Sequence, residues 1–180
     1  MRIIGGSLKG LRLNPPKNLP VRPTTDLAKE ALFNILQNQI NFEGIRVLDL
    51  FSGTGNIAME FASRGAKQVV SVDRSIHCVH YLKDTARQHG LSNIQAYKDD
   101  VFKYLQLETG QYDLIFADPP YDLNRIPDLP KIIFDKNLLP SNSFLIVEHQ
   151  SMQNLSNHPA FLEQRKYGHS SFSFFKASVT

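Results

Sequence analysis

The sequence has little cysteine, no long apolar run and no acidic residue near its start. Its single cysteine among 180 residues, Cys78, cannot form a disulfide within the chain, which favours a reducing compartment. We expect an ordinary helix position for Cys78 rather than a reactive thiol. No apolar run approaches the length of a membrane span, and the apolar stretch after Arg2 is too short for a signal peptide. These absences exclude membrane and secreted proteins and predict a soluble, cytoplasmic one.

No acidic side chain precedes Asp26. The first 22 residues carry five basic side chains instead, namely Arg2, Lys9, Arg12, Lys17 and Arg22. Such a segment is either a solubilising tail or an arm that binds the phosphates of a nucleic acid, and we favour the arm. We therefore divide the chain into a basic N-terminal extension, residues 1–22, and one folded domain, residues 23–180.

Two elements are expected before the main part of this domain. Residues 2–4 and 11–13 flank a glycine-containing turn and predict a small hairpin. A helix should begin near Asp26, capped by Thr24 or Thr25, and should bury one apolar face against the body of the protein.

Beyond Gly44, short apolar runs alternate with segments of helical periodicity. We expect strands at 46–50, 68–72, 94–97, 112–117 and 143–147, and helices at 56–64, 76–89, 101–107 and 129–137. This alternation predicts an α/β fold in which a parallel sheet is covered by helices on both faces. The last segments, 161–167 and 171–177, flank Gly168 and predict an antiparallel hairpin that closes the sheet.

The first of these strands leads into a glycine-rich turn, which is typical of a nucleotide-type cofactor site. Gly53 and Gly55 permit positive φ and let a ligand approach the backbone at the start of the next helix. Gly53-x-Gly55-x-x-Ala58 also satisfies the dinucleotide fingerprint. However, Asp49 at the end of the strand would repel a pyrophosphate and attract the ammonium and sulfonium of S-adenosylmethionine. The stretch resembles motif I of the class I S-adenosylmethionine-dependent methyltransferases.

The next two predicted strands also end in carboxylates. Asp73, 24 residues after Asp49, can accept hydrogen bonds from both ribose hydroxyls of an adenosine. Asp100 can accept one from the adenine amino group, although Asp99 could exchange roles with it. Ligands of parallel sheets bind beyond the carboxyl ends of the strands, so we expect these side chains at one edge of the sheet.

The fourth predicted strand ends in Asp118-Pro119-Pro120-Tyr121. An exocyclic amino group on a purine is a poor nucleophile because its lone pair is delocalised into the ring. Two fixed acceptors, the Asp118 carboxylate and the Pro119 carbonyl, would make that nitrogen more pyramidal and expose the lone pair. The prolines stiffen the turn, and Tyr121 offers a flat face for stacking of the base. The motif is typical of amino-methyltransferases.

Four stretches resemble those of the RsmD family, bacterial enzymes that methylate guanine N2 in small-subunit (16S) ribosomal RNA: Arg2-Ile3-Ile4-x-Gly6, Arg22-Pro23-Thr24-Thr25-Asp26, Glu30-Ala31-Leu32-Phe33-Asn34 and Asp118-Pro119-Pro120-Tyr121. The resemblance implies a Rossmann-like enzyme whose cofactor, S-adenosylmethionine, is bound by Asp49, Gly53, Gly55, Asp73 and Asp100. It assigns the target base to Asp118, Pro119 and Tyr121. The implied partner is ribosomal RNA within a partly or fully assembled small subunit, and the basic arm would bind this RNA.

Other interpretations remain open. The main alternative is an adenine-N6 methyltransferase acting on DNA or RNA, because this class has a similar motif. An oxidoreductase would have to bind NAD beside Asp49, which the charge of Asp49 disfavours. A ribosome-assembly factor without enzymatic activity would have no use for the Asp-Pro-Pro-Tyr turn. His77 and His80 share a helix face, but no third ligand accompanies them, so we expect no metal. Glu148 ends the fifth predicted strand and either lines the site or is solvated.

Overall fold

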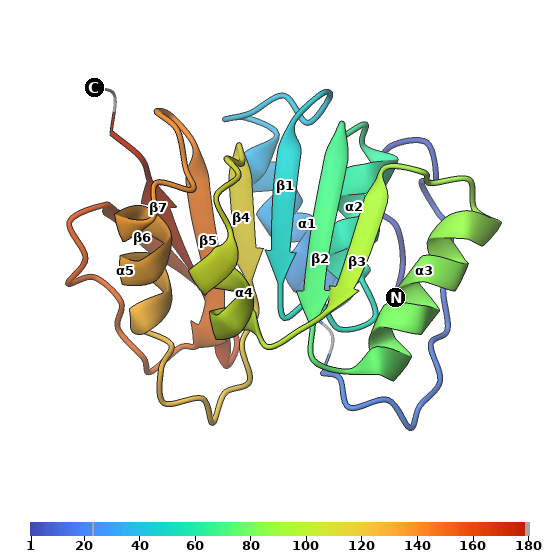
Figure 1. Cartoon of the computed structure of the whole chain (residues 1–180). Coiled ribbons are helices and arrows are strands. Elements are labelled where there is room, and N and C mark those ends of the chain that lie inside the picture. The colour runs from blue at the N-terminus through green and yellow to red at the C-terminus, as the bar shows by residue number, and fades with distance from the viewer. Residues whose placement is uncertain (23, 179–180) are drawn as a thin grey trace.

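The computed structural model describes residues 1–22 and 24–178, which form one mixed seven-stranded sheet with helices on both faces (Figure 1). The strands are β1 (Arg46–Leu50), β2 (Gln68–Asp73), β3 (Ile94–Lys98), β4 (Leu114–Ala117), β5 (Phe144–Gln150), β6 (Phe161–Tyr167) and β7 (Ser170–Lys176). The helices are α1 (Asp26–Leu36), α2 (Asn56–Ser63), α3 (Ile76–Gln88), α4 (Val101–Leu107) and α5 (Asp128–Asp135). None of the helices in this described part of the chain has the length and apolar character needed to cross a membrane.

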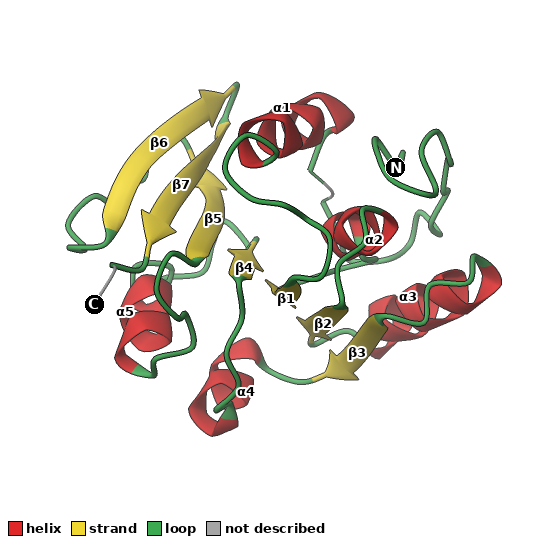
Figure 2. Ribbon diagram, turned by 90° about the horizontal axis from the view of Figure 1, so that it is seen from above, coloured by secondary structure: helices red, strands yellow, loops and turns green. Residues whose placement is uncertain are grey.

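The sheet has the strand order β3-β2-β1-β4-β5-β7-β6. Strands β1 to β5 run parallel, and β7 is antiparallel to both of its neighbours. Seen from above, α1, α2 and α3 cover one face while α4 and α5 cover the other (Figure 2). Each face has its own buried apolar cluster. The order reverses at β1, so the carboxyl ends of β1 and β4 flank the point where ligands bind in such sheets.

The predicted order of strands and helices is confirmed, including the closing hairpin around Gly168, whose φ is +65°. The differences lie at the ends of elements. Strand β4 begins at Leu114 rather than at Tyr112, because the N–H of Tyr112 donates to the Leu138 carbonyl outside the sheet. Strand β5 continues to Gln150 because β7 pairs along its whole length. That pairing joins segments distant in the sequence, so local patterns could not predict it.

Helix α1 is capped by Thr25, whose hydroxyl accepts from the N–H of Ala28 at 3.2 Å. The sequence left the choice between Thr24 and Thr25 open. Because Thr25 is the cap, the hydroxyl of Thr24 is available for a partner elsewhere. Pro23, which belongs to the same motif, lies outside the described residues. Cys78 is buried in the first turn of α3, the helix position expected for it.

The N-terminal hairpin is present but contains only one β-bridge, between Arg2 and Arg12. Its apolar side chains Ile3 and Leu13 are buried in the cluster that also contains residues of α1 and α2. Gly6 lies so close to α2 that an added Cβ would be 2.0 Å from the Ser63 carbonyl oxygen. The hairpin is therefore part of the packed core, while the RNA-binding role of residues 1–22 stays a prediction.

A buried ion pair joins this hairpin to the two helices beneath it. Lys29 of α1 and Glu60 of α2 are fully buried, and Nζ lies 2.9 Å from Oε1. Glu60 also accepts from the backbone N–H groups of Ile4 at 2.8 Å and Gly5 at 2.9 Å. The guanidinium of Arg64, directly after α2, donates to Oε2 at 2.7 Å. The carboxylate is thus saturated by donors from three parts of the chain, which is the condition under which a buried charge is tolerated.

The ammonium of Lys29 makes two further hydrogen bonds. It donates to the Arg2 carbonyl at 2.8 Å and to Oδ1 of Asn56 at 2.9 Å. The amide nitrogen of Asn56 in turn donates to the Thr24 carbonyl at 3.2 Å. Because Asn56 is the first residue of α2, directly after the glycine-rich turn, this network fixes the segment around Thr24 relative to that turn.

We expect Glu60→Ala to lower the free energy of unfolding by about 3–5 kcal/mol, because it leaves the Lys29 ammonium buried without a counter-charge. Glu30→Ala is the matched control, since the Glu30 side chain is 47% exposed and its carboxylate lies 3.7 Å from Arg2. Exposed pairs contribute at most about 1 kcal/mol. Denaturant unfolding of both variants tests the difference, and equal losses would contradict the structural role given to Glu60.

Candidate active site

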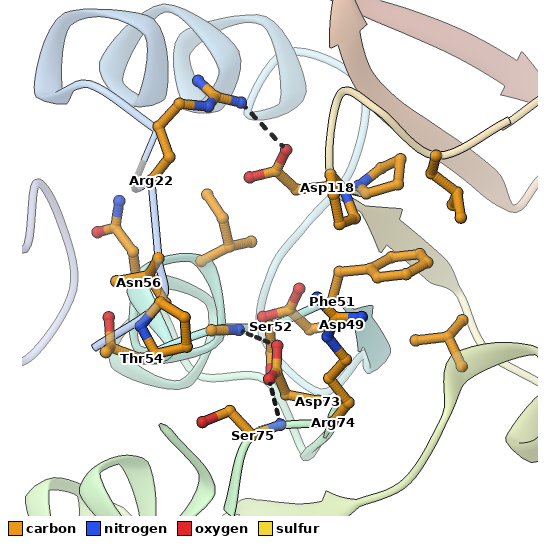
Figure 3. Close-up of a pocket in the computed structure, with 18 of the residues that line it drawn as sticks. Arg22, Asp49, Phe51, Ser52, Thr54, Asn56, Asp73, Arg74, Ser75 and Asp118 are labelled. Atoms are coloured by element: carbon orange, nitrogen blue, oxygen red, sulfur yellow. Dashed lines mark hydrogen bonds and ion pairs between the residues drawn. The ribbon is translucent and has the colours of Figure 1, made fainter. Parts of the chain in front are cut away.

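A cavity of about 730 Å³ opens at the carboxyl ends of the parallel strands (Figure 3). The residues predicted from the sequence that line it are Asp49, Gly53, Asp73, Asp100, Asp118, Pro119 and Tyr121. Arg22 lines it as well, although we expected it only as a contact for RNA. The cavity lining does not include Gly55, Arg2, Lys9, Arg12 or Lys17. One site therefore collects the strand-end carboxylates and the Asp-Pro-Pro-Tyr turn.

The two glycines of the turn have different surroundings. Both have left-handed backbones, with φ of +55° at Gly53 and +90° at Gly55, as the sequence predicted. Gly53 lies on the cavity. At Gly55, an added Cβ would lie 2.3 Å from Cδ1 of Leu82, so this glycine permits the close packing of α3 against the turn. Of the two, only Gly53 is placed to let a ligand approach.

Asp49 is the most buried carboxylate on the cavity. Its exposed fraction is 1%, and its Oδ2 has no hydrogen-bond partner within residues 1–22 and 24–178. Burial, and then the negative charge of Asp73, raise the pKa of Asp49 well above its ordinary value. A buried oxygen that lacks a donor is where a cationic or N–H-bearing ligand group would be stabilised.

Asp73 holds the glycine-rich turn in place. Its Oδ2 accepts from the N–H of Gly53 at 2.8 Å and its Oδ1 from the N–H of Ser75 at 2.9 Å, as Figure 3 shows. A carboxylate oxygen can accept more than one hydrogen bond, so these contacts are compatible with the ribose contacts predicted for Asp73. The structure thus adds a second role, fixing the turn, to the predicted one.

Asp99 and Asp100 both line the cavity. Oδ1 of Asp100 caps α4 by accepting from the N–H of Lys103 at 3.0 Å, while Oδ1 of Asp99 accepts from the N–H of Asp100 at 2.8 Å. Each side chain therefore has one oxygen engaged by the backbone, and the choice between them as the adenine contact stays open.

Arg22 covers the place expected for the target base. Its guanidinium lies 3.9 Å from the centroid of the Tyr121 ring and 3.8 Å from Oδ1 of Asp118. Figure 3 shows this side chain reaching across the cavity toward Asp118. The Arg22 side chain is 53% exposed, so it is free to leave. A base that stacked on this face of Tyr121 would have to displace it.

Glu148 neither lines the cavity nor is solvated, the two possibilities that the sequence left open. It is 1% exposed, and its carboxyl group interacts with that of Asp118. Its Oε2 accepts from the Thr24 hydroxyl at 2.5 Å. Burial, and then the charge of Glu148, raise the pKa of Asp118, and burial also raises the pKa of Glu148. The indication in the sequence was its position at the end of a strand, which it shares with Asp49 and Asp73.

The charges around the cavity favour a cationic ligand. Its lining contains the carboxylates of Asp49, Asp73, Asp99, Asp100, Asp118 and Asp122 and the guanidinium groups of Arg22 and Arg74. The unpartnered oxygen of Asp49 and this excess of negative charge fit S-adenosylmethionine and oppose a pyrophosphate. Across the described ranges, no group of three or more His, Cys, Asp or Glu side chains is arranged to hold a metal ion.

Comparison with known protein sequences gives matches over most of the chain. A family model described as conserved hypothetical protein 95 matches residues 1–176, which include the hairpin and the whole cavity. The protein YlbH of Bacillus subtilis (strain 168) is 35% identical over 154 residues, 83% of this chain and 82% of that protein. The ribosomal RNA small subunit methyltransferase D of Escherichia coli (strain K12) is 28% identical over 162 residues, 89% of this chain and 80% of that protein.

Comparison with solved structures bears on the fold. The Thermus thermophilus 16S rRNA N2 methyltransferase RsmC, in complex with AdoMet and guanosine, matches with a TM-score of 0.75 and 22% sequence identity. The match covers 98% of this chain and 49% of that chain. The fold is that of the S-adenosylmethionine-dependent methyltransferases, and the predicted fold class is confirmed.

The raised pKa of Asp49 predicts that binding of S-adenosylmethionine releases a proton. The free protein holds Asp49 protonated up to that raised pKa, whereas a cationic ligand favours the ionised form, so affinity should rise with pH and level off above the pKa. Calorimetric titration in two buffers of different ionisation enthalpy measures the protons released. Asp49→Asn should bind more weakly without the pH dependence, and the exposed Asp84→Asn serves as control. Binding of equal affinity across pH, with no proton released, would contradict this assignment.

Proposed function

The chain belongs to the RsmD family, whose model is described as conserved hypothetical protein 95, and from this membership we propose that it methylates small-subunit ribosomal RNA at the exocyclic N2 of a guanine. The methyl donor in this proposal is S-adenosylmethionine. The observation that carries it is the Asp118–Tyr121 turn, which shares one cavity with Asp49 and Asp73. A purine-amino acceptor site and a site for a cationic cofactor thereby meet at the edge of one sheet.

The chain's own contribution to the reaction is to hold the amino group. Oδ1 of Asp118 is buried and has no hydrogen-bond partner among the described residues, so it is available to accept from one N–H of the base. The Pro119 carbonyl can accept from the other. Bound S-adenosylmethionine supplies an electrophilic methyl group, and placing the nitrogen in line with it can contribute roughly 7–11 kcal/mol to lowering the barrier.

The target base must leave its stack to reach this position. A base within a helix cannot lie against Tyr121 with its amino edge toward the cavity, so it is flipped out or already single-stranded. In the free protein Arg22 occupies the ring face and pairs with Asp118. The incoming base replaces both contacts, and the released guanidinium is then close enough to bind a phosphate of the flipped nucleotide.

Basic residues of the N-terminal segment extend this surface. Lys9, Arg12 and Lys17 are exposed, whereas Arg2 is partly engaged by Asp26 at 3.8 Å. We assign the three exposed side chains and Arg22 to phosphates of the RNA, with Arg2 contributing more weakly. The substrate in this proposal is RNA within a partly or fully assembled small subunit.

The identity of the methylated atom is testable in RNA from cells that lack the gene. We expect the loss of one N2-methylguanosine from small-subunit RNA, found by mass spectrometry of a nuclease digest and restored by the wild-type gene. Both guanine and adenine present an amino group that would satisfy the two acceptors. Loss of an N6-methyladenosine instead would move the protein to the alternative class, the adenine-N6 methyltransferases.

The role of Asp118 predicts a separation of catalysis from cofactor binding. Asp118→Ala should lower kcat by on the order of 100-fold or more, because an acceptor that acts on the reacting group is lost, while S-adenosylmethionine affinity stays nearly unchanged. Asp118→Asn keeps a carbonyl acceptor and should retain part of the activity. The exposed Asp128→Ala on α5 is the control. An alanine variant that turns over at the wild-type rate would exclude Asp118 from the chemistry.

A further inference from the structure

Glu148 is a buried acid that no step described so far uses. It lies at the carboxyl-terminal part of β5, next to β4 in the sheet, and is 1% exposed. Its two partners are the Asp118 carboxyl and the Thr24 hydroxyl, the latter at 2.5 Å. Thr24 is itself buried, and its carbonyl is fixed by the amide of Asn56. These contacts form a chain from Asn56 through Thr24 and Glu148 to Asp118, which lines the cavity.

Two carboxyl groups in hydrogen-bond contact and out of water cannot both be ionised without a large cost, so such a pair shares one proton. The charged groups facing Asp118 are Arg22, which favours its ionised form, and Asp49, which opposes it. Those facing Glu148 are Arg22 and Asp118, with the Thr24 hydroxyl beside them. Burial raises the pKa of both carboxyls, which favours one shared proton over two ionised groups.

The position of that proton decides what Asp118 can do. On Asp118, it would engage one of the oxygens that must accept from the target amino group. On Glu148, it makes the Glu148 carboxyl a donor to one Asp118 oxygen and leaves the other Asp118 oxygen as an acceptor for the target amino group. The Thr24 hydroxyl donates to Oε2 of Glu148 and thereby holds this carboxyl in its orientation.

We propose that Glu148, held by Thr24, is a positioning residue for methyl transfer: it orients Asp118 as an acceptor, and the Asp118–Glu148 pair takes up the proton that the target nitrogen loses. This inference rests on the proposed function and adds the proton acceptor to it. It also assigns separate roles to the neighbouring threonines, since Thr25 caps α1 and Thr24 binds Glu148.

The step balances in atoms and charge. A bond forms between the target nitrogen and the methyl carbon as the carbon–sulfur bond breaks, and the electron pair of that bond stays on sulfur and cancels its positive charge. The nitrogen then loses one N–H proton to Asp118. The carboxyl pair passes from one negative charge to none, and returns to its starting state when the proton leaves to water with the product.

The test compares Glu148→Gln with the wild type, because glutamine keeps the size and hydrogen bonds of the side chain but cannot titrate. The glutamine amide donates to Asp118 as the protonated Glu148 does, so this variant should keep S-adenosylmethionine affinity and nearly wild-type kcat at neutral pH. Glu148→Leu removes that donor and should lower kcat by about 100-fold, the scale of general acid–base catalysis. Wild-type kcat should fall on the alkaline side as the pair loses its last proton, because two charged carboxylates in contact repel each other. The glutamine variant should lack this alkaline limb.

A second readout is independent of activity. Infrared spectra of the free protein at neutral pH, recorded in an Asp49→Asn background so that Asp49 does not contribute, should contain the band of a buried protonated carboxyl. That band should disappear in Glu148→Gln. If the band persists, or if it is absent from the parent protein, the shared proton does not exist and the proposal is wrong.

Thr24 gives a matched pair of variants. Thr24→Val should lower kcat and shift its pH profile, whereas Thr24→Ser keeps the hydroxyl and should restore both. Thr25→Val is the control, since it removes a helix cap and should affect stability alone.

A wild-type protein that methylates no RNA would refute the proposed function, yet the infrared titration would still decide whether the pair holds a proton. A glutamine variant that keeps the alkaline limb, or a leucine variant with wild-type kcat, would overturn the role of Glu148.

Discussion

Repulsion among carboxylates is the constraint that governs the edge of the sheet where the cavity lies. Parallel strands bring the side chains at their carboxyl ends together, and here three of them are Asp49, Asp73 and Asp118. Each is stabilised in a different way. Burial raises the pKa of Asp49, the backbone N–H groups of Gly53 and Ser75 bind Asp73, and Asp118 lies between Glu148 and Arg22. The free protein thus stores negative charge that a cationic ligand can compensate directly.

These arrangements differ in how easily a ligand replaces them. The contacts of Asp73 are made by the backbone and persist when a ligand binds, so they shape the cavity. The contact between Arg22 and Asp118 is made by a long, exposed side chain at 3.8 Å and is replaceable. The same cavity therefore combines a fixed half, around the glycine-rich turn, with an adjustable half, around the Asp-Pro-Pro-Tyr turn. S-adenosylmethionine suits the first half, and the RNA base of the proposed function suits the second.

Much of the site could be predicted because strand-end positions are visible in the sequence. A short apolar run that ends in an acidic residue places Asp49, Asp73 and Asp118 at one edge of a parallel sheet, whatever the details of packing. Gly55 was a different case. Its positive φ was predictable from the turn, but its contact with Leu82 depends on how α3 docks, and no local pattern records that docking.

The pairing of Glu148 with Thr24 shows where prediction from the sequence ends. The two residues are 124 positions apart, and their contact requires that β5 lie beside β4 and that the segment before α1 cross the same edge of the sheet. The buried network around Lys29 holds that segment in place, because it ties the Arg2 carbonyl and, through Asn56, the Thr24 carbonyl to α2. The residue that reaches Glu148 thus lies just after the basic extension of residues 1–22, and the packing of that extension on α1 and α2 fixes where Thr24 lies. The folded hairpin at the N-terminus therefore positions a contact at the edge of the sheet, apart from the phosphate binding proposed for its basic side chains.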